Sequence, residues 1–465
     1  MKGETKMKQW KQIGKRCMAL LMAVVLVGGL LSGCGKSQSG SNGSGSDGSD
    51  GPIKLVLWST YGTYGTQYLN TLIEKFNDSQ DEYVLESSSG SDASTIRSKM
   101  QSSKVENYPS LICGTSTTMT AYAEADYVAP IQQFMDADSE DWNAGMFDVV
   151  RYAYSDQEGK MIGYPVGVSC NGYLVNVDLL KEAGYTLEDL TSFEKIVEAA
   201  TAAVNKKICK YGLAFYDGVD VLDMLTMQGV DIVDGGNGYT GEVTKSLLLE
   251  GESNAALTKA VNLIAKMYQD GVALDYGYGS DCSSIFKAND LLFWKCTNSS
   301  THNVFTANSG IDWAFIPSVG VDENAEFKGS ALSEGTGIFI CNTGDEKEMQ
   351  GAYEFIKFLS QPENQNYFEQ GIGYLPYTKE AAEQYMEWAK ENFPSAEKLL
   401  NMLSNSPKEL QLPYVAVGGE INLAFADLLG TISVSPKGDV NTYIEDASSA
   451  IDAALKIYEM RKENQ

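Results

Sequence analysis

The chain has 465 residues, with 62 acidic and 35 basic side chains, which gives a formal net charge of −27 at pH 7. A field of this sign repels nucleic acid and anionic lipid surfaces, so neither is expected as a partner. His302 is the only histidine, which excludes a histidine-rich metal site, and no cofactor is expected. The length exceeds the size at which a single core stops growing and predicts two lobes.

The N-terminus has the pattern of an export signal. Basic side chains precede an apolar run at residues 18–31, which is too short to span a bilayer comfortably. Residues 31–34, Leu-Ser-Gly-Cys, match a lipobox, in which a peptidase cuts before a cysteine that carries diacylglycerol. We therefore expect residues 1–33 to be a lipoprotein signal peptide. Cys34 would carry the lipid, palmitate among its acyl chains, and hold the protein at the extracellular face of the cell membrane.

Residues 34–52 have a composition that cannot bury a core. They are almost entirely Gly, Ser, Asp and Asn after the cysteine, which is typical of a flexible coil. We interpret this segment as a tether, and the folded part then begins near Pro52.

The remaining sequence alternates between short β-rich apolar runs and longer runs with apolar residues three and four positions apart. This alternation predicts α/β lobes with largely parallel sheets. Thr191 and Glu194 match a capping box and predict a helix start. In chain order we expect a strand at 53–58, a helix at 68–76, strands at 84–85 and 111–113, helices at 193–204 and 257–268, a strand at 337–341 and a helix at 352–359.

Six cysteines remain once Cys17 has left with the signal and Cys34 is lipidated. None of the six lies in a C-x-x-C motif or beside a histidine, so the spacing of a metal site is absent. Disulfide bridges and buried free thiols stay open as alternatives. The six are Cys113, Cys170, Cys209, Cys282, Cys296 and Cys341.

Four segments carry a family resemblance: residues 159–168 (GKMIGYPVGV), 173–184 (YLVNVDLLKEAG), 352–363 (AYEFIKFLSQPE) and 373–376 (GYLP). In order and spacing they resemble the extracellular solute-binding protein family 1, which includes maltose- and glycerol-phosphate-binding receptors. The resemblance runs from about residue 53 to residue 450. It implies a two-lobed, periplasmic-binding-protein-like (type II) α/β fold with a ligand cleft between the lobes.

The function implied by the resemblance is that of a monomeric substrate-binding lipoprotein of an ABC importer. It would capture a sugar or oligosaccharide by lobe closure and deliver it to the permease subunits, without catalysis. The chain would cross between the lobes near 164–169, 332–335 and 373–376. The first lobe would comprise residues 53–166 and 333–374, and the second lobe residues 167–332 and 375–465.

A sugar cleft needs aromatic faces for the ring C–H surfaces and polar groups for every hydroxyl. Core packing is the competing interpretation of each aromatic, and Asp92 and Asp217 fit solvated loop acids equally well. By position, the resemblance implies Trp58, Tyr61, Asp92, Thr115 and Ser116 from the first lobe, Tyr216, Asp217, Trp294 and Asn298 from the second, and Ser169, Thr336 and Tyr374 at the crossings.

Other functions stay open at this point. No nucleophile, P-loop or metalloprotease motif occurs, but a secreted glycosidase needs only two carboxylates, whose separation sequence spacing cannot reveal. A surface adhesin would share the signal and the tether. A phosphate ester such as glycerol 3-phosphate is the alternative ligand. The position that matches the arginine of the glycerol-phosphate branch is Ala416, which favours an uncharged ligand.

Overall fold

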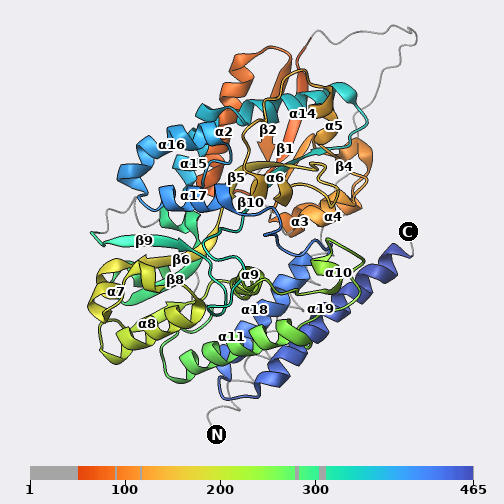
Figure 1. Cartoon of the computed structure of the whole chain (residues 1–465). Helices are drawn as coiled ribbons and strands as arrows, with labels where there is room; N and C mark the ends of the chain where they lie inside the picture. The colour runs from red at the N-terminus through yellow and green to blue at the C-terminus, as the bar shows by residue number, and fades with distance from the viewer. Residues whose placement is uncertain (1–50, 89–91, 116–117, 278–281, 303–309, 464–465) are drawn as a thin grey trace, which may run out of the picture. The chain divides into compact units, whose positions relative to one another are not determined.

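The computed structural model describes residues 51–88, 92–115, 118–277, 282–302 and 310–463 (Figure 1). The expected signal peptide, most of the tether, Cys34 and Ser116 lie outside the described residues. Among the residues described, no helix is both long enough and apolar enough to cross a membrane.

The first sheet has the strand order β2-β1-β3-β10-β4, with β5 also paired to β10. Strand β1 is parallel to β2 and β3, whereas β10 is antiparallel to β3, β4 and β5. The strands are β1 (Ile53–Trp58), β2 (Tyr83–Ser88), β3 (Leu111–Thr115), β4 (Val128–Ala129), β5 (Tyr164–Ser169) and β10 (Glu334–Cys341).

The second sheet has the order β7-β8-β6-β9. Strand β6 is antiparallel to β8 and β9, and β7 is parallel to β8. Its strands are β6 (Asn171–Asn176), β7 (Tyr211–Ala214), β8 (Leu291–Thr297) and β9 (Trp313–Pro317).

Both sheets are mixed, so the expectation of largely parallel sheets was wrong. The reason is the path of the chain. After β5 the chain passes into the second sheet as β6, and it later returns to the first sheet as β10, which runs antiparallel to β3. Parallel pairs occur where a helix lies between two neighbouring strands, as between β1 and β2.

The expected strands and helices are all present; β1 has the predicted bounds, and the others are longer than the sequence predicted. The α-helices are α2 (Thr63–Ser79), α3 (Ala93–Ser102), α4 (Met119–Ala123), α5 (Gln132–Ala137), α6 (Asp148–Ala153), α7 (Val177–Ala183), α8 (Phe193–Asn205), α9 (Val219–Gln228), α10 (Asp234–Asn237), α11 (Gly251–Gln269), α12 (Cys282–Lys287), α14 (Glu346–Leu359), α15 (Pro362–Ile372), α16 (Lys379–Asn392), α17 (Ala396–Asn405), α18 (Gly418–Val434) and α19 (Val440–Lys462). Short 3-10 turns lie at Val105–Asn107, Leu187–Asp189 and Asn298–Thr301.

The start of α8 differs from the expected capping box. Ser192 is the N-cap and makes no side-chain cap bond, and the Thr191 hydroxyl donates instead to the Glu323 carboxylate. A capping box is formed five residues before the expected one, between Thr186 and Asp189. A tertiary contact therefore replaces the local one that the sequence predicted.

Two hydrophobic cores are present among the described residues, and the second sheet contributes to both, with Trp294 and Phe315 in the first core. The first core includes Leu57, Ile112 and Phe339 of the first sheet, and the second includes Val175 and Leu213 of the second sheet. Helices α18 and α19 pack in the second core, as α8, α9 and α11 do.

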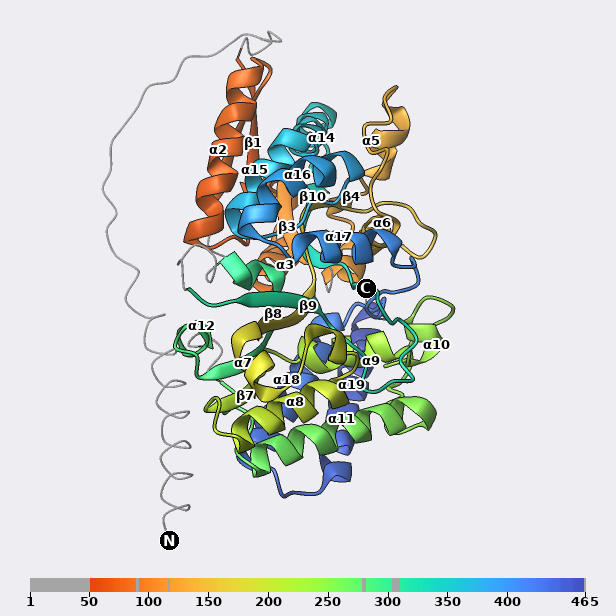
Figure 2. The same cartoon turned by 60° about the vertical axis from the view of Figure 1, so that its left-hand side comes forward.

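Helices α16 and α17 pack in the first core, which also contains Trp294 and Phe315 of the second sheet. Tyr385 of α16 and Leu399 of α17 are buried there, and the expected boundary at residue 374, with residues 375–465 in the second lobe, stays a prediction. Leu375 exchanges two backbone hydrogen bonds with Val168 of β5, which holds the chain beside the first sheet after Tyr374. In both views α17 lies next to β9 (Figures 1 and 2), and the rings of Trp313 and Phe393 stack there.

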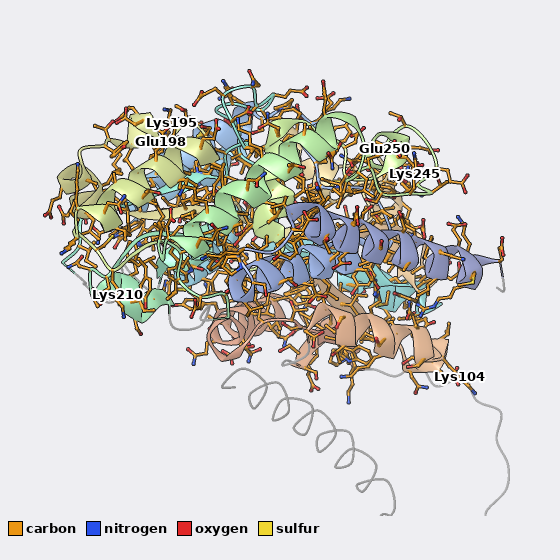
Figure 3. The ribbon with its side chains drawn as sticks, turned by 90° about the horizontal axis from the view of Figure 1, so that it is seen from below. Lys104, Lys195, Glu198, Lys210, Lys245 and Glu250 are labelled. Atoms are coloured by element: carbon orange, nitrogen blue, oxygen red, sulfur yellow. The ribbon has the colours of Figure 1, made fainter. Side chains whose placement is uncertain are left out.

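Several charged pairs lie at the periphery, for example Lys195 with Glu198 and Lys245 with Glu250 (Figure 3). Such exposed pairs contribute about 0 to 1 kcal/mol each, so they have little effect on the fold. The acidic excess acts mainly on solubility.

Candidate functional site

The two sheets are joined by strands that lie side by side. Only Cys170 separates β5 from β6, and β10 begins beside the end of β5, where Glu334 pairs with Ser169. Gly335 has a φ of +129°, and a Cβ there would overlap the Gly167 carbonyl oxygen, so only glycine fits this close approach. The three expected crossing segments thus meet at one place.

Asn298 connects two of these segments by hydrogen bonds. Its Oδ1 accepts a hydrogen bond from the Cys170 N–H (2.6 Å), and its Nδ2 donates to the Gly373 carbonyl (2.7 Å). The side chain is 0 % exposed. The sequence predicted that Asn298 contacts ligand, but the structure uses both ends of its amide to hold the crossing segments.

An aromatic and hydroxyl cluster lies at the same place, which we call the crossing cluster: Tyr61, Tyr154, Ser169, Thr336 and Tyr374. Burial raises the pKa of Tyr61 and of Tyr374, the Tyr374 ring adds to the rise at Tyr61, and the Thr336 hydroxyl is near enough to lower both pKa values. Tyr61 packs edge-on against Phe368 at 5.2 Å. Four of the five were predicted cleft residues, and Tyr154 was missed because it lies in no recognisable motif.

Three hydroxyls of the crossing cluster are buried without a hydrogen-bond partner among the described residues: those of Tyr61, Tyr154 and Ser169. A buried hydroxyl without a partner costs about 1 to 3 kcal/mol, so native folds rarely keep several together. Groups of this kind suit a polar molecule that brings its own donors and acceptors.

Gly167 lets the Tyr374 ring reach the cluster. A Cβ at residue 167 would overlap the Tyr374 ring, so the ring lies directly on the backbone of β5. The Tyr374 carbonyl accepts a hydrogen bond from the Tyr385 hydroxyl (3.1 Å), which fixes the backbone of this residue.

Trp58 and Thr115 end the neighbouring strands β1 and β3. Trp58 is half-buried, and the Lys99 ammonium lies 5.7 Å from the centre of its ring. Thr115 pairs with Thr336 in the sheet. The Thr118 hydroxyl accepts a hydrogen bond from the Thr115 N–H and donates one to the Thr115 carbonyl. Both residues thus lie at the edge where the crossing cluster begins.

Asp92 has a local structural role that its sequence position did not reveal. It is the N-cap of α3, and its carboxylate accepts hydrogen bonds from the Thr95 N–H (2.9 Å), the Thr95 hydroxyl (2.8 Å) and the Ser94 hydroxyl (2.5 Å). These hydrogen bonds hold the pKa of Asp92 well below its usual range. The structure therefore favours the loop-acid interpretation.

Trp294 lies in the first core and is 4 % exposed, and its buried indole N–H has no hydrogen-bond partner among the described residues, so its contact with ligand stays a prediction. Its neighbours in the sheet are Leu174 and Ala214. The polar run after it, which suggested an exposed position, begins only at Thr297.

Tyr216 and Asp217 form a loop in the second lobe that Asp220 holds. The Asp220 carboxylate accepts from the backbone N–H groups of Tyr216 (2.6 Å) and Asp217 (3.2 Å). Asp217 in turn accepts from Gly218 N–H (2.6 Å) and from the Asn422 amide (3.2 Å). Tyr216 is 49 % exposed, which leaves its ring accessible.

A buried ionic group lies close to the crossing, and the sequence analysis missed it. Lys295 is 3.3 Å from Asp223 and donates to the Ser318 hydroxyl (2.5 Å), and the Asn171 amide donates to Glu334 (2.7 Å). Burial, with Asp223 nearby, raises the pKa of Glu334 well above its usual range. The available signal was a lysine inside the otherwise apolar strand β8.

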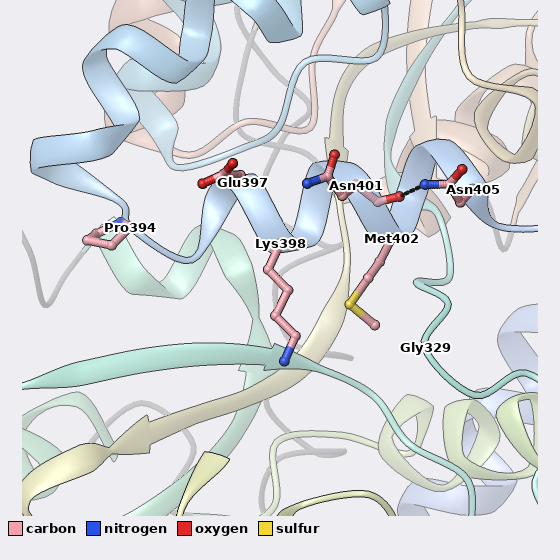
Figure 4. A pocket seen from close by; sticks show the side chains of 7 residues that line it. All are labelled: Gly329, Pro394, Glu397, Lys398, Asn401, Met402 and Asn405. Atoms are coloured by element: carbon pink, nitrogen blue, oxygen red, sulfur yellow. Dashed lines mark hydrogen bonds between the residues drawn. The ribbon is translucent and has the colours of Figure 1, made fainter. Parts of the chain in front are cut away.

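A hollow of about 450 Å³ runs along α17, lined among others by Glu397, Lys398 and Asn401. Figure 4 shows that these polar side chains do not converge: Lys398 points toward β9, whereas Glu397 and Asn401 point away from it. This arrangement offers no common point for a ligand.

The cysteine alternatives are resolved in favour of free thiols. All six cysteines, Cys113 included, are buried and unbridged. Burial raises the pKa of Cys113 to about 12, so the thiol is protonated and unreactive at neutral pH. Within the described ranges, no group of three His, Cys, Asp or Glu side chains could hold a metal ion.

Comparison with known proteins identifies relatives. Residues 71–395 match the family model for bacterial extracellular solute-binding proteins. The sn-glycerol-3-phosphate-binding periplasmic protein UgpB of Yersinia pestis is 23% identical over 361 residues, which cover 74% of this chain and 78% of that protein. UgpB of Escherichia coli (strain K12) is 22% identical over 358 residues, 73% and 78% of the two chains.

Solved structures share the fold. The sugar-binding protein MalE of Xanthomonas citri has a TM-score of 0.73 at 16% identity and covers 89% of this chain and 100% of that chain. The cyclic alpha-maltosyl-1,6-maltose binding protein of Arthrobacter globiformis has a TM-score of 0.68 at 16% identity, with 87% and 100% covered. The predicted two-lobed α/β fold is thereby confirmed, and the chain belongs to the bacterial extracellular solute-binding protein family.

Proposed function

We propose that this solute-binding protein captures a neutral sugar or short oligosaccharide and delivers it to the permease subunits of an ABC importer. The crossing cluster is the observation that carries the proposal. It combines the rings of Tyr61 and Tyr374 with buried hydroxyls that have no partner among the described residues. Rings contact the C–H faces of a sugar, and such hydroxyls pair with its hydroxyl groups.

The proposed contact set is the crossing cluster, Trp58 and Thr115 at the strand ends, and Tyr216 and Asp217 from the second lobe. The sequence also predicted Trp294, Asn298 and Asp92, which make packing, strand-bridging and helix-capping contacts, and their contact with ligand stays a prediction. Ser116 is kept as a proposed contact from the family resemblance alone.

Calorimetry on the purified protein tests the ligand class. Maltose-type and xylose-type oligosaccharides are compared with glycerol 3-phosphate, and we expect heat only from an oligosaccharide. Tyr374→Ala should weaken that binding tenfold or more, whereas Trp313→Ala, another partly buried aromatic outside the cluster, should leave it unchanged. Product release from the sugar would support a glycosidase, and binding without product supports the receptor.

Glycerol 3-phosphate is the second candidate, because curated relatives carry that ligand in their names. A phosphate ester needs an arginine guanidinium or several hydrogen-bond donors. The position that matches the family's arginine is the half-buried Ala416. Lys295 does not replace the arginine, because Asp223 and Ser318 engage its ammonium. Tight binding of the phosphate ester alone would overturn the sugar proposal.

We also propose that Cys34 anchors the protein to the outer face of the membrane, on the strength of the lipobox sequence. Cys34→Ser removes the sulfur that the thioether needs, so the variant should be unprocessed or shed into the medium. Membrane fractionation with mass spectrometry of the mature N-terminus checks this. An unchanged membrane fraction with no lipid mass on Cys34 would contradict it.

A further inference from the structure

A cavity of about 380 Å³ lies where α9 and α10 end, and none of the predicted cleft residues lines it. Its walls come from four separate parts of the chain: the segment after α6, the α9–α10 connection, residues 326–327 and residues 408–411. We call it the α10 cavity. Its volume is within the range of small-molecule sites.

Hydrogen bonds join the walls to one another. The Gln157 amide donates to the Gly238 carbonyl, and Tyr414 N–H donates to the Asn237 carbonyl (2.8 Å). Gln411, buried at the wall, donates to the Val149 carbonyl (3.0 Å). The cavity is therefore bounded by segments that are fixed relative to their neighbours.

Carboxylates give the cavity a negative lining. The exposed carboxylates of Asp231, Glu326 and Glu409 line it. Gly229, with a φ of +85°, has no side chain, and a Cβ there would overlap the Glu326 carboxylate. The Glu326 side chain thus lies against the backbone of Gly229.

The one cationic side chain in the lining, Lys408, is already engaged. Its ammonium donates to the Tyr152 hydroxyl (3.1 Å) and lies 4.8 Å from the centre of that ring. The three carboxylates therefore remain the dominant charge, and a bound anion would be repelled.

The cavity also offers an inner hydroxyl and aromatic faces. Thr226 is 5 % exposed, and its hydroxyl has no partner among the described residues. Tyr239 donates its hydroxyl to the Leu412 carbonyl (3.0 Å), which fixes the ring, and Phe327 lines the same cavity. Aromatic faces beside carboxylates attract ammonium groups.

We propose that the α10 cavity is a second ligand site, which binds a small organic cation, an amine or a quaternary ammonium compound. The carboxylates of Asp231 and Glu326 neutralise the charge, Tyr239 and Phe327 contact the carbon skeleton, and Thr226 accepts from an N–H or O–H of the ligand. The site is separate from the crossing cluster, so either assignment can fail without the other.

Calorimetry on the whole mature protein with putrescine, choline and glucosamine tests this site, with glucose as the neutral probe. We expect at least one amine to bind and glucose not to bind at this site. Asp231→Asn and Glu326→Gln should each weaken the amine about fivefold or more, and added salt should weaken it further. Glu323→Gln is the matched control, because this nearby exposed carboxylate does not line the cavity.

Three results would overturn the proposal. The first is the absence of binding by all three amines. The second is equal amine affinity in Asp231→Asn, Glu326→Gln and the control, with melting temperatures unchanged. The third is amine binding that Tyr374→Ala abolishes while both carboxylate variants retain it, since the ligand would then lie at the crossing cluster.

Discussion

At the scale of single residues, Asn298 is expected to stabilise the fold through its two buried hydrogen bonds. Asn298→Ala leaves the buried Cys170 N–H and Gly373 carbonyl without their partner. Each such group costs about 1 to 3 kcal/mol, so we expect the free energy of unfolding to fall by about 2 to 5 kcal/mol. Denaturant unfolding measures this change. Asn401→Ala on the exposed surface of α17 is the control, and an equal change in both variants would contradict the assignment.

Asp220 predicts how stability depends on pH. Burial raises its pKa to about 7, and Asp223 adds to the rise, while Lys295 and the Tyr216 N–H partly oppose it. An unfolded aspartate titrates near 3.9. Between about pH 4 and pH 7 the folded chain therefore holds a proton that the unfolded chain has released. The stability from this group is complete below pH 4 and is lost as the pH rises through 7.

The matched variant for this prediction is Asp220→Asn, which keeps an acceptor for the Tyr216 and Asp217 N–H groups. The difference in unfolding free energy between wild type and variant should change by on the order of a few kcal/mol between pH 4 and pH 8. Urea unfolding at each pH gives the two curves. Parallel curves would show that Asp220 titrates normally.

At the scale of elements, β5 and the segment around Tyr374 depend on Gly167. Gly167→Ala places a methyl group against the Tyr374 ring, which must move away from the crossing cluster. We expect ligand affinity to fall tenfold or more and the protein to be destabilised by about 1 to 3 kcal/mol. Gly419→Ala, where a Cβ meets nothing within 4 Å, should change neither quantity. Calorimetry and thermal melting separate the two effects.

The elements that the sequence predicted are present, because apolar periodicity is a local signal, and many further helices and strands were not predicted. Helix α11 and strand β1 follow this periodicity closely. Interactions between distant parts of the chain were not predictable. Thr191 binds Glu323 in place of its own helix end, and Asn298 binds Cys170 and Gly373. The prediction of parallel strands was wrong for the same reason, because the direction of a strand depends on where the chain re-enters the sheet.

The candidate site stays a prediction, and the structure shows which of its residues lie together. Tyr61, Thr336 and Tyr374, which were named from the family resemblance, meet at the crossing cluster, although Tyr61 and Tyr374 lie outside the strands. Trp294 and Asp92 were named by residue type and by a nearby polar segment, and such features do not distinguish a contact residue from a core or capping residue. Tyr154 lies near Tyr374 in the folded chain, and no sequence motif marks its position.

At the scale of the whole molecule, contacts between elements of the two cores bear on ligand-driven closure. Arg97 of α3 lies 3.6 Å from Glu420 of α18, and the Tyr458 hydroxyl of α19 donates to Glu124. Each contact joins an element of the first core to an element of the second core. The contacts therefore stabilise the lobe arrangement in which these elements lie together. A ligand that contacts both lobes favours the same arrangement.

We therefore expect the radius of gyration measured by small-angle scattering to fall when a saturating sugar is added. Arg97→Ala should weaken sugar binding by about twofold, because a partly exposed ion pair contributes only about 0.2 to 1 kcal/mol. Glu420→Gln should have the same effect, and the double variant should be no weaker than either, since both remove one contact. Lys195→Ala, which breaks an exposed pair within α8, is the control. If sugar bound tightly and the scattering curve stayed unchanged, binding would not require lobe closure. Additive losses in the double variant would instead mean that Arg97 and Glu420 act separately.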